Sequence, residues 1–265
     1  MVSREDNCMN AYLDQLFSLR DRVAVITGGS SGIGRAIALA LGQAGAAVVV
    51  VARDPHRLEE ATRELTQAGC QAFAVSADLG DREAVGSAAN AIRRPFGPPD
   101  ILVNNAGLNL RPPLAELTTD QWDQLMAVNL TAPFLLGQVF GPVMADRGWG
   151  RIINITSQQA DRAFGNSGGY GVAKGGLASL TRSQSEAWAG NGVCCNAICP
   201  GFVVTPLSAE VAADPARVSA LAARTMAGRN GLPSDFAGAA VFLASRASDY
   251  VTGQIIRVDG GFSVT

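Results

Sequence analysis

Short runs of β-branched and other apolar residues alternate with longer alanine-rich stretches along almost the whole chain. The short runs are apolar at every position, so a sheet built from them must be covered on both faces. This pattern predicts an α/β fold: a doubly wound parallel sheet with helices on each side and ligands at the carboxyl ends of its strands. The expected strands are residues 23–27, 47–52, 71–76, 100–104, 151–156, 193–198 and 254–258.

Helical patterns fill the segments between these strands. They lie at residues 32–43, 55–68, 81–94, 119–145, 167–189 and 234–244, with a looser helical region at about 208–227. No linker, repeat or low-complexity segment divides the series, and the length suits one unit of this class. We therefore expect a single Rossmann-like domain of three layers, α/β/α, over residues 21–265. Residues 1–20 are expected to form an N-terminal extension, as an arm or a short helix.

Composition and charge argue against several classes of protein. Apolar residues make up 48% of the chain and charged residues 17%, which favours a sizeable core over disorder. The net charge of −2 offers no basic face to a nucleic acid. The N-terminus holds no apolar signal-peptide core, and the longest apolar run, residues 44–52, is too short to cross a bilayer. We expect a soluble, cytoplasmic protein with no nucleic-acid or membrane partner.

The cysteines and the histidine do not form the pattern of a disulfide framework or a zinc site. The chain has five cysteines and one histidine, His56, and no two cysteines have C-x-x-C spacing. The odd count argues against a disulfide framework, and a zinc site would need more ligands at characteristic spacing. We therefore expect no metal site, a reducing compartment, and packing of Cys194 and Cys199 as small apolar residues.

A glycine-rich turn separates the first expected strand from the first expected helix. Residues 23–38 read VAVITGGSSGIGRAIA, which places Gly28, Gly32 and Gly34 between the two elements. Glycine there permits a tight turn and close backbone approach, and a helix N-terminus offers free N–H groups to a pyrophosphate. A turn that only packs is the alternative. The strand–turn–helix context favours a dinucleotide site.

Tyr170 and Lys174 are four residues apart and so lie on one face of the expected helix, about 6 Å apart along its axis. A free tyrosine has a pKa of about 10, and a nearby ammonium group lowers it. The pair could therefore exchange a proton at neutral pH. On spacing alone, an exposed tyrosine beside a solvated lysine is the commoner arrangement.

Several motifs follow one another along the chain. They are T-G-x-x-x-G-x-G after the first strand, N-N-A-G at residues 104–107, Ser157, and Y-x-x-x-K at Tyr170 and Lys174. Together they resemble the short-chain dehydrogenase/reductase family, in its single-domain branch. P-G at residues 200–201 and V-D-G-G at residues 258–261 also match, so the resemblance runs from about residue 20 to the end.

The resemblance implies an oxidoreductase that transfers a hydride between a nicotinamide cofactor and a carbonyl or secondary alcohol. It assigns Tyr170 as the general acid or base. Lys174 would tune the tyrosine and hold the nicotinamide ribose, and Ser157 would hydrogen-bond the substrate oxygen. Asn129 matches the asparagine that helps to hold a proton-relay water. Because His56 lies far upstream of these motifs, a Ser–His–Asp hydrolase is disfavoured.

The residues after the second strand favour NADP, with NAD as the alternative. Ala52 stands where relatives that prefer NAD have an aspartate, and Arg53 stands where NADP users often have a basic residue. Ser30 and Ser31, in place of a second basic residue, and the neighbouring Asp54 weaken this preference. The full set of cofactor contacts that the resemblance implies is Gly28, Ser30, Ser31, Gly32, Ile33, Gly34, Arg53, Asp78, Leu79, Asn105, Ala106, Gly107, Tyr170, Lys174, Pro200, Gly201, Val203 and Thr205.

A polar set of residues surrounds the expected substrate pocket, and residues 206–231 are expected to form its loop. The residues expected near the substrate are Leu108, Asn109, Arg111, Gln158, Gln159, Arg162, Phe164 and Leu207. The mixture suggests a polyol or a sugar acid, while a loop rim facing water explains it equally well. An aliphatic ketone, a steroid-like ring and a 3-oxoacyl thioester remain open.

Two other readings stay open beside the NADP-dependent carbonyl reductase. One is an NAD-dependent polyol or sugar-acid dehydrogenase of the same family. The other, of a different class, is a non-enzymatic dinucleotide-binding sensor, which the intact set of Ser157, Tyr170, Lys174 and Asn129 disfavours. An epimerase or dehydratase of the longer branch is disfavoured by the short C-terminal portion. The resemblance also implies a homodimer or homotetramer built on the helices at 119–145 and 167–189.

Overall fold

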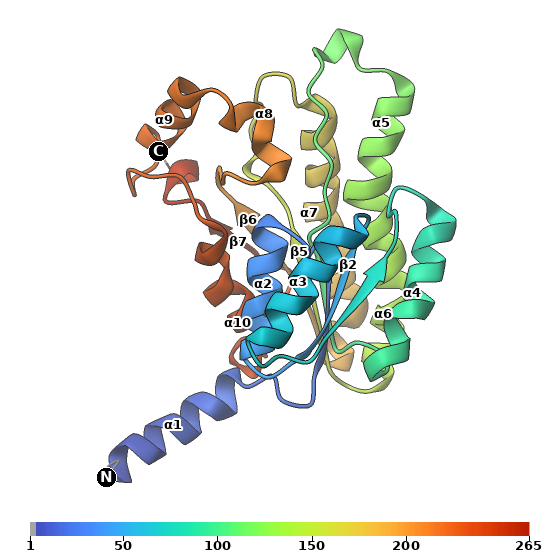
Figure 1. The fold of residues 1–265 in the computed structure, drawn as a ribbon, viewed down its shortest axis with the longest axis vertical. Helices are drawn as coiled ribbons and strands as arrows, with labels where there is room; N and C mark the ends of the chain where they lie inside the picture. Colours follow the sequence, from blue (N-terminus) through green and yellow to red (C-terminus); the bar gives the residue numbers. More distant parts are fainter. Residues whose placement is uncertain (1–3, 265) are drawn as a thin grey trace.

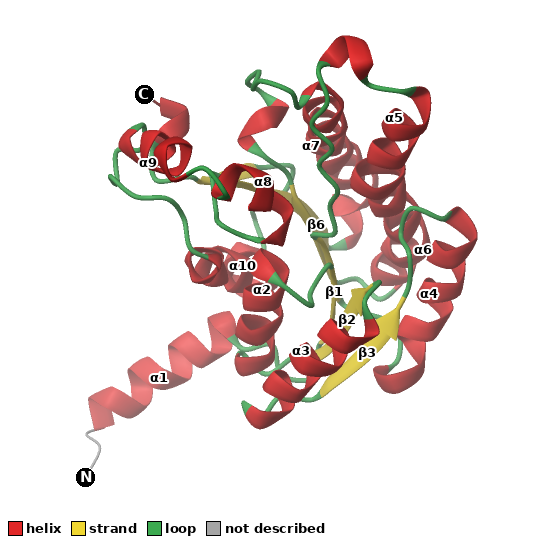
Figure 2. Cartoon of the chain, turned by 45° about the horizontal axis from the view of Figure 1, so that its top comes forward, coloured by secondary structure: helices red, strands yellow, loops and turns green. Residues whose placement is uncertain are grey.

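The computed structural model describes residues 4–264, with side chains from residue 11 onward. Its centre is a parallel sheet in the order β3-β2-β1-β4-β5-β6-β7 (Figures 1 and 2). The fold class predicted from the sequence, a doubly wound Rossmann-like sheet in one domain, is confirmed. The strands are β1 (Val23–Thr27), β2 (Ala47–Ala52), β3 (Ala72–Ser76), β4 (Ile101–Asn104), β5 (Gly150–Ile155), β6 (Val193–Pro200) and β7 (Ile255–Val258).

Helices cover both faces of the sheet. α2, α3 and α10 pack on one face, and α4, α6 and α7 pack on the other. The helices are α2 (Gly32–Gln43), α3 (Pro55–Gln67), α4 (Arg82–Phe96), α5 (Thr119–Met126), α6 (Ala132–Asp146), α7 (Gly168–Trp188), α8 (Ala209–Ala212), α9 (Pro215–Ala223) and α10 (Ala237–Ala244).

Two apolar cores explain why the strands lack alternation. In β1, Ala24 and Ile26 belong to the core under α2 and α10, whereas Val25 belongs to the core under α4 and α6. Successive side chains of a strand point to opposite faces, so a sheet buried on both faces needs an apolar residue at every position. In β2, Val48 and Val49 divide between the two cores in the same way.

The single helix expected over residues 119–145 is interrupted. α5 and α6 are joined by a π-helical turn, Ala127–Thr131. There the Asn129 side chain donates to the carbonyl of Leu125, 2.9 Å away, at the point where the α-helical hydrogen-bond series is broken. Such π-turns in helices are often found at functional sites.

By length and hydropathy, Thr119–Asp146 is the one helical stretch of the described chain that could cross a bilayer. The core helix of a soluble protein passes the same test. This stretch packs against the sheet and against α4 and α7, and Leu136, Phe140 and Met144 lie fully inside the second core. These contacts favour a core helix.

α1 (Arg4–Phe17) extends away from the three layers (Figure 1). The expected extension over residues 1–20 begins outside the described residues, because the structure describes nothing before residue 4.

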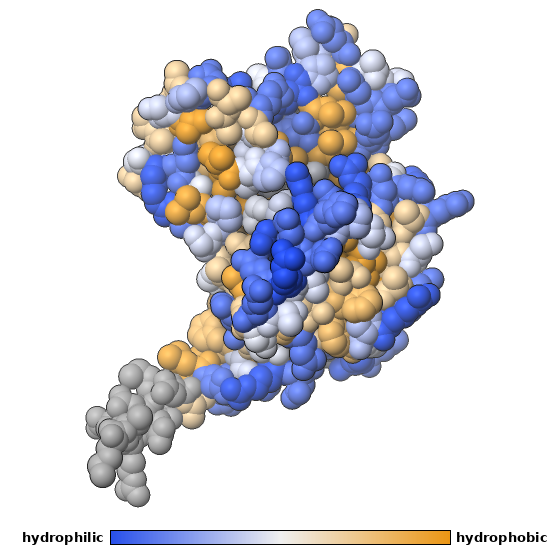
Figure 3. All heavy atoms as spheres, in the orientation of Figure 1, coloured by the Kyte–Doolittle hydropathy of each residue, from blue (hydrophilic) through white to orange (hydrophobic). Residues whose placement is uncertain are grey.

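At the opposite end of the chain, residues 259–264 lie beside α9 (Figures 1 and 2). Apolar surface gathers over the α8–α9 region, where Leu207 and Met226 are exposed (Figure 3).

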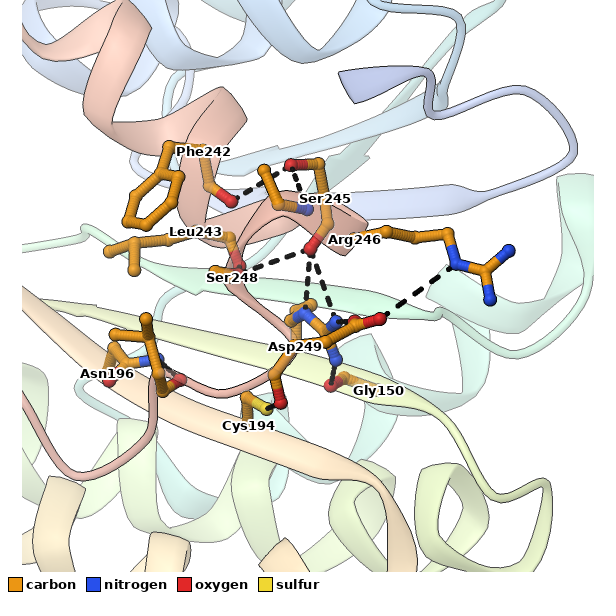
Figure 4. A network of polar contacts seen from close by, with 12 residues as sticks. Gly150, Cys194, Asn196, Phe242, Leu243, Ser245, Arg246, Ser248 and Asp249 are labelled. Atoms are coloured by element: carbon orange, nitrogen blue, oxygen red, sulfur yellow. Dashed lines mark hydrogen bonds and ion pairs between the residues drawn. The ribbon is translucent and has the colours of Figure 1, made fainter. Parts of the chain in front are cut away.

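A buried cation lies at the amino edge of the sheet, that is, the side at which its strands begin. Arg151, at the start of β5, is 1% exposed. Its guanidinium donates to the carbonyls of Gly150 and Ser245 and pairs with the carboxylate of Asp249. Figure 4 shows these three partner residues close together in one network of polar contacts. Its Cζ also lies 4.4 Å from the ring centroid of Trp149, and Arg22 stacks on the same ring at 3.8 Å. These contacts tie β5 to the segment between α10 and β7.

Candidate active site

A cavity of about 450 Å³ lies along the carboxyl ends of β1, β4, β5 and β6. This volume is in the range of small-molecule sites. A second cavity, of about 180 Å³, adjoins it near the end of β2 and shares Gly28 and Arg53 with it. The predicted residues on the larger cavity are Gly28, Ser31, Gly32, Ile33, Arg53, Asn105, Ala106, Gly107, Leu108, Asn109, Arg111, Ser157, Gln158, Gln159, Tyr170, Lys174, Pro200, Gly201, Val203, Thr205 and Leu207. Those that line the smaller one without lining the larger are Ser30, Asp78 and Leu79.

Four predicted site residues lie behind the cavities rather than on them, and one of these, Arg162, donates to the carbonyl of Ser263. Gly34 sits against the β1–α2 turn, where a Cβ would come within 2.4 Å of the Gly28 carbonyl oxygen, so glycine is needed for packing. Asn129 is fully buried and bonds the backbone of Leu108 through both ends of its amide. The Phe164 ring stacks on Phe262 at 6.1 Å instead of facing the cavity.

The glycine turn is held open toward the larger cavity. Gly28 and Gly32 have φ angles of +64° and +53°, which favour glycine. The Asn105 side-chain amide donates to the carbonyls of Thr27 and Gly28 at 3.0 and 3.1 Å, and so fixes the turn to the end of β4. The N-terminus of α2 therefore faces the cavity with a fixed backbone, an arrangement suited to a pyrophosphate.

Tyr170, Lys174 and Ser157 form one buried group. Tyr170 is 6% exposed and Lys174 is 2% exposed. The Lys174 ammonium donates to the Ile155 carbonyl at 2.8 Å and lies 5.6 Å from the centroid of the Tyr170 ring. Ser157 lies close enough to the Tyr170 phenol to lower its pKa. The end of β5 and the first turns of α7 thus bring the three side chains together at the cavity wall.

Burial dominates the titration of this group. It raises the pKa of Tyr170 to about 12, against the effect of Ser157 and the charge of Arg111, which lower it. Burial also lowers the pKa of Lys174 to about 7. In the protein alone, burial therefore outweighs any lowering of the Tyr170 pKa by Lys174, and the expected lowering in the presence of a cationic nicotinamide stays a prediction. Because burial lowers the pKa of Lys174 to about 7, its ammonium group loses its proton before the phenol titrates and does not offset the burial of the phenol.

The wall opposite the glycine turn is polar and only partly satisfied. Side-chain oxygens of Asn109, Gln158 and Gln159 are buried without a hydrogen-bond partner among the described residues. Buried acceptors of this kind are normally paired. Arg111 is close by, and its pKa is lowered by burial and by Arg217, while Glu210 and Tyr170 oppose that shift. The wall therefore offers hydrogen-bond acceptors and one cation to a ligand.

Comparisons with known proteins agree with this geometry. A family profile described as enoyl-(acyl carrier protein) reductase matches residues 28–263. Gluconate 5-dehydrogenase of Gluconobacter oxydans is 40% identical over 94% of this chain and 98% of its own length. The 5-keto-D-gluconate 5-reductase of Escherichia coli K12 is 37% identical over 95% of this chain and 99% of its own.

Solved structures give the same result. A gluconate 5-dehydrogenase from Burkholderia cenocepacia, in complex with NADP and tartrate, is 38% identical, with a TM-score of 0.90 over 96% of this chain and 99% of that one. This chain belongs to the short-chain dehydrogenase/reductase family. The predicted enzyme class, an NAD(P)-dependent oxidoreductase acting on a CH–OH group, is confirmed.

One residue beside the second strand escaped the sequence analysis. Arg57, in the first turn of α3, lines both cavities together with Arg53. The Arg53 guanidinium lies 3.9 Å from the Asp78 carboxylate, and that of Arg57 lies 3.4 Å from Asp54. The sequence held a signal: Arg57 follows Arg53 by four residues, and α3 is capped by Asp54, so its first turn begins beside the cofactor end of β2.

Proposed function

We propose that this short-chain dehydrogenase/reductase interconverts a keto sugar acid and its hydroxy acid with NADP(H), as its gluconate 5-dehydrogenase relatives suggest. The observation that carries the proposal is the larger cavity. It is lined by the Ser157–Tyr170–Lys174 group, by the glycine turn, and by a polar wall with one arginine. This lining offers groups that would bind a nicotinamide nucleotide and groups that would bind a small polar acid.

The residues around the glycine turn fit NADP. The backbone of the turn would hold the pyrophosphate at the N-terminus of α2. Arg53 and Arg57 would bind the 2′-phosphate, and Arg57 would replace the second basic residue that the serines of the glycine turn do not supply. The contacts proposed along the rest of the cofactor are Ser30, Asp78, Leu79, Asn105, Ala106, Gly107, Lys174, Pro200, Gly201, Val203 and Thr205.

Tyr170 would exchange the proton of the reaction. With a pKa raised to about 12, its phenol stays protonated at neutral pH and can donate to a carbonyl oxygen. Ser157 would donate a second hydrogen bond to the same oxygen, which stabilises the developing alkoxide. The bound nucleotide supplies or accepts the hydride. In the direction of oxidation, Tyr170 must first lose its proton, which the positive charge of an oxidised nicotinamide would favour. Lys174, with a pKa of about 7, would add to this effect in its protonated form.

The polar wall would recognise the rest of the substrate. Arg111 would bind the carboxylate, and the unpaired amide oxygens of Asn109, Gln158 and Gln159 would accept hydrogen bonds from hydroxyl groups. Leu207 would pack against the carbon chain. Asn129 would act indirectly, because its amide positions Leu108 at the cavity rim. A fatty-acyl chain would leave these polar groups unpaired, so we do not favour an acyl carrier protein substrate.

We also propose that residues 21–265 form the enzyme domain, that the protein is cytoplasmic, and that it forms a homodimer or homotetramer. The contact between the long helices α6 and α7, on which the family resemblance places the assembly, supports the last of these proposals. Analytical ultracentrifugation of the whole chain tests the assembly, and a purely monomeric protein would contradict it.

Nicotinamide absorbance tests the function. The whole chain is mixed with NADPH or NADH and with 5-keto-D-gluconate, 2-dehydro-3-deoxy-D-gluconate, L-tagatose or a 3-oxoacyl thioester. We expect turnover of a keto sugar acid with NADPH. Turnover of the thioester alone would overturn the substrate class, and turnover with NADH alone would overturn the cofactor. Binding of NADPH without turnover of any compound would favour a dinucleotide sensor.

Cofactor binding tests Arg57 apart from catalysis. Replacing Arg57 with Ala should weaken NADPH binding about tenfold or more, since a charged hydrogen bond is lost, and should leave NADH binding unchanged. Arg63→Ala, a change on the exposed side of the same helix, is the control. Equal NADPH affinity in Arg57→Ala and in the wild type would remove Arg57 from the site.

A further inference from the structure

The C-terminal segment, residues 259–264, contacts two other segments that border the larger cavity. One is the β5–α7 loop, residues 156–167, which carries Ser157 at its start and leads into Tyr170. The other is the substrate segment, residues 206–231, which contains α8 and α9. Both segments end well before residue 259 in the sequence, yet the C-terminal segment lies beside α9 in the fold (Figures 1 and 2).

Phe262 is the residue of this segment that reaches both. Its ring is 2% exposed, which is unusual so close to a chain end. It stacks on Phe164 of the β5–α7 loop, with the two ring centroids 6.1 Å apart and an interplanar angle of 24°. The guanidinium carbon of Arg224, in the substrate segment, lies 4.4 Å from the same ring centroid. The ring therefore lies between the two segments.

Polar contacts hold the C-terminal segment in this place. The Asp259 carboxylate accepts hydrogen bonds from the backbone N–H groups of Gly261 and Ser263 at 3.0 and 2.9 Å. Arg162 donates to the carbonyl of Ser263, which secures the β5–α7 loop to the segment. The backbone N–H of Ala227 donates to the Gly260 carbonyl at 3.0 Å, which secures the substrate segment.

Close packing adds to these bonds. Gly261 has a φ of +82°, and a Cβ there would lie 2.9 Å from the Met226 side chain, so the substrate segment approaches the tail as closely as glycine allows. The ion pair between Arg257, in β7, and Asp161 joins the β5–α7 loop to the edge strand from which the tail emerges. The C-terminal segment and β7 thus connect both segments to the sheet.

We propose that Phe262 is a positioning residue, which sets the distance between the substrate segment and the β5–α7 loop and thereby shapes the substrate end of the cavity. The inference rests on the proposed function of that cavity. Phe262 lines neither cavity, so it would act through Phe164 and Arg224. Loss of the ring would let the two segments separate, and the substrate would then meet Arg111 and Ser157 at the wrong spacing. Cofactor binding, on the glycine-turn side, would be unaffected.

The test compares Phe262→Ala with Phe262→Leu and with Phe73→Ala, which removes a half-exposed ring on the far edge strand β3. We expect Phe262→Ala to raise the KM for 5-keto-D-gluconate about tenfold, because small misplacements at a site are costly, with NADPH affinity unchanged. Phe262→Leu should recover part of the loss, and Phe73→Ala should match the wild type. A wild-type KM in Phe262→Ala, or an equal loss of NADPH affinity, would overturn the proposal.

Two surface variants keep the test usable if Phe262→Ala fails to fold. Phe164→Ala and Arg224→Ala should each raise KM, and the double variant should show less than the product of the two effects, because both act through one ring. Wild-type KM values in both single variants would overturn the proposal.

Limited trypsin digestion gives a readout that needs no substrate. Arg217 and Arg229 are exposed cleavage sites in the substrate segment. We expect faster cleavage there in Phe262→Ala than in the wild type or Phe73→Ala. If no sugar acid is turned over but this difference is seen, the proposed substrate fails and the positioning role stands. Equal cleavage rates would count against Phe262 itself.

Discussion

A cation is buried at the amino edge of the sheet, where the strands begin, and another at the carboxyl edge, where they end. The two cations are stabilised differently. At the amino edge, Arg151 is 1% exposed and each of its guanidinium nitrogens has an acceptor, including a carboxylate. At the carboxyl edge, Lys174 is 2% exposed and donates to one backbone carbonyl, and no ion pair to it is formed within residues 11–264. Its pKa falls to about 7 as a result.

The difference separates a structural charge from a functional one. A buried charge is stabilised by pairing and by hydrogen bonds, and a group left short of both shifts its pKa instead. Groups with shifted pKa values and unpaired polar neighbours are typical of active sites. The unpaired side-chain oxygens of Asn109, Gln158 and Gln159 lie beside Lys174 on the larger cavity.

The largest effect should follow from a change at the carboxyl edge that barely touches stability. Tyr170→Phe removes the proposed proton donor and should lower kcat by about 10²- to 10⁴-fold. NADPH affinity should stay within experimental error of the wild type. Tyr250→Phe, at a fully exposed tyrosine, is the control. Steady-state kinetics with NADPH make the measurement, and normal turnover in Tyr170→Phe would remove Tyr170 from the mechanism.

A change at the amino edge should do the reverse. Asp249→Asn leaves the buried Arg151 without its carboxylate and should reduce the free energy of unfolding by about 1–3 kcal/mol, with normal kinetics. Arg151→Met should cost less, because it removes the buried charge itself and leaves Asp249, which is half-exposed, to be solvated by water. Urea denaturation measures both. If Arg151→Met is the more destabilised of the two, the charge itself contributes net stability and this account of the edge is incorrect.

The pH dependence of stability should report on Lys174. Its pKa in the folded chain is about 7, below the ordinary value of 10.5. Between these values the unfolded chain binds a proton that the folded chain does not, so the folded state gains stability as pH rises. The gain is at most about 1.4 kcal/mol per pH unit. Lys174→Met should lack this slope in urea denaturation between pH 7 and 10; identical slopes would show that Lys174 is charged when folded.

The smallest effect is expected at the rim of the amino edge. Arg22 is one-third exposed, stacks on Trp149 and lies 3.4 Å from the Asp100 carboxylate. Arg22→Gln should reduce the free energy of unfolding by no more than about 1 kcal/mol, and less in high salt, because solvent screens such pairs. A loss as large as that of Asp249→Asn would mean that Trp149 depends on both arginines.

The sequence predicted the sheet well because each strand carries its own signal. Every expected strand was found, with ends shifted by at most two residues, as in β6, since burial on both faces requires continuous apolar runs. The motif residues were also brought to one edge, because parallel strands end together. The stacking of Phe164 on Phe262 depends on tertiary packing, which local patterns do not encode. Arg57 did carry a local signal, its spacing from Arg53 and the Asp54 cap, and was missed because that turn was not considered.

The direction of the Tyr170 pKa shift could not be predicted from the sequence for a related reason. Spacing shows that Lys174 is near the phenol, but the direction of the pKa shift depends on how deeply both groups are buried. Burial of a helical residue is set by what packs over it, which for Lys174 includes the end of β5, where the Ile155 carbonyl accepts its hydrogen bond. A sequence pattern shows which residues are neighbours along one helix. It does not show how far Tyr170 and Lys174 are shielded from water.

The π-helical turn at Ala127–Thr131 has a consequence for insertions and deletions. A helix advances by about 100° per residue, so the extra residue of a π-turn rotates everything after it by that amount relative to α5. Deleting one residue there would turn Leu136 and Phe140 of α6 away from the core they now fill. Homologous sequences should therefore keep a constant number of residues between Leu125 and Leu136, even where the residues themselves vary.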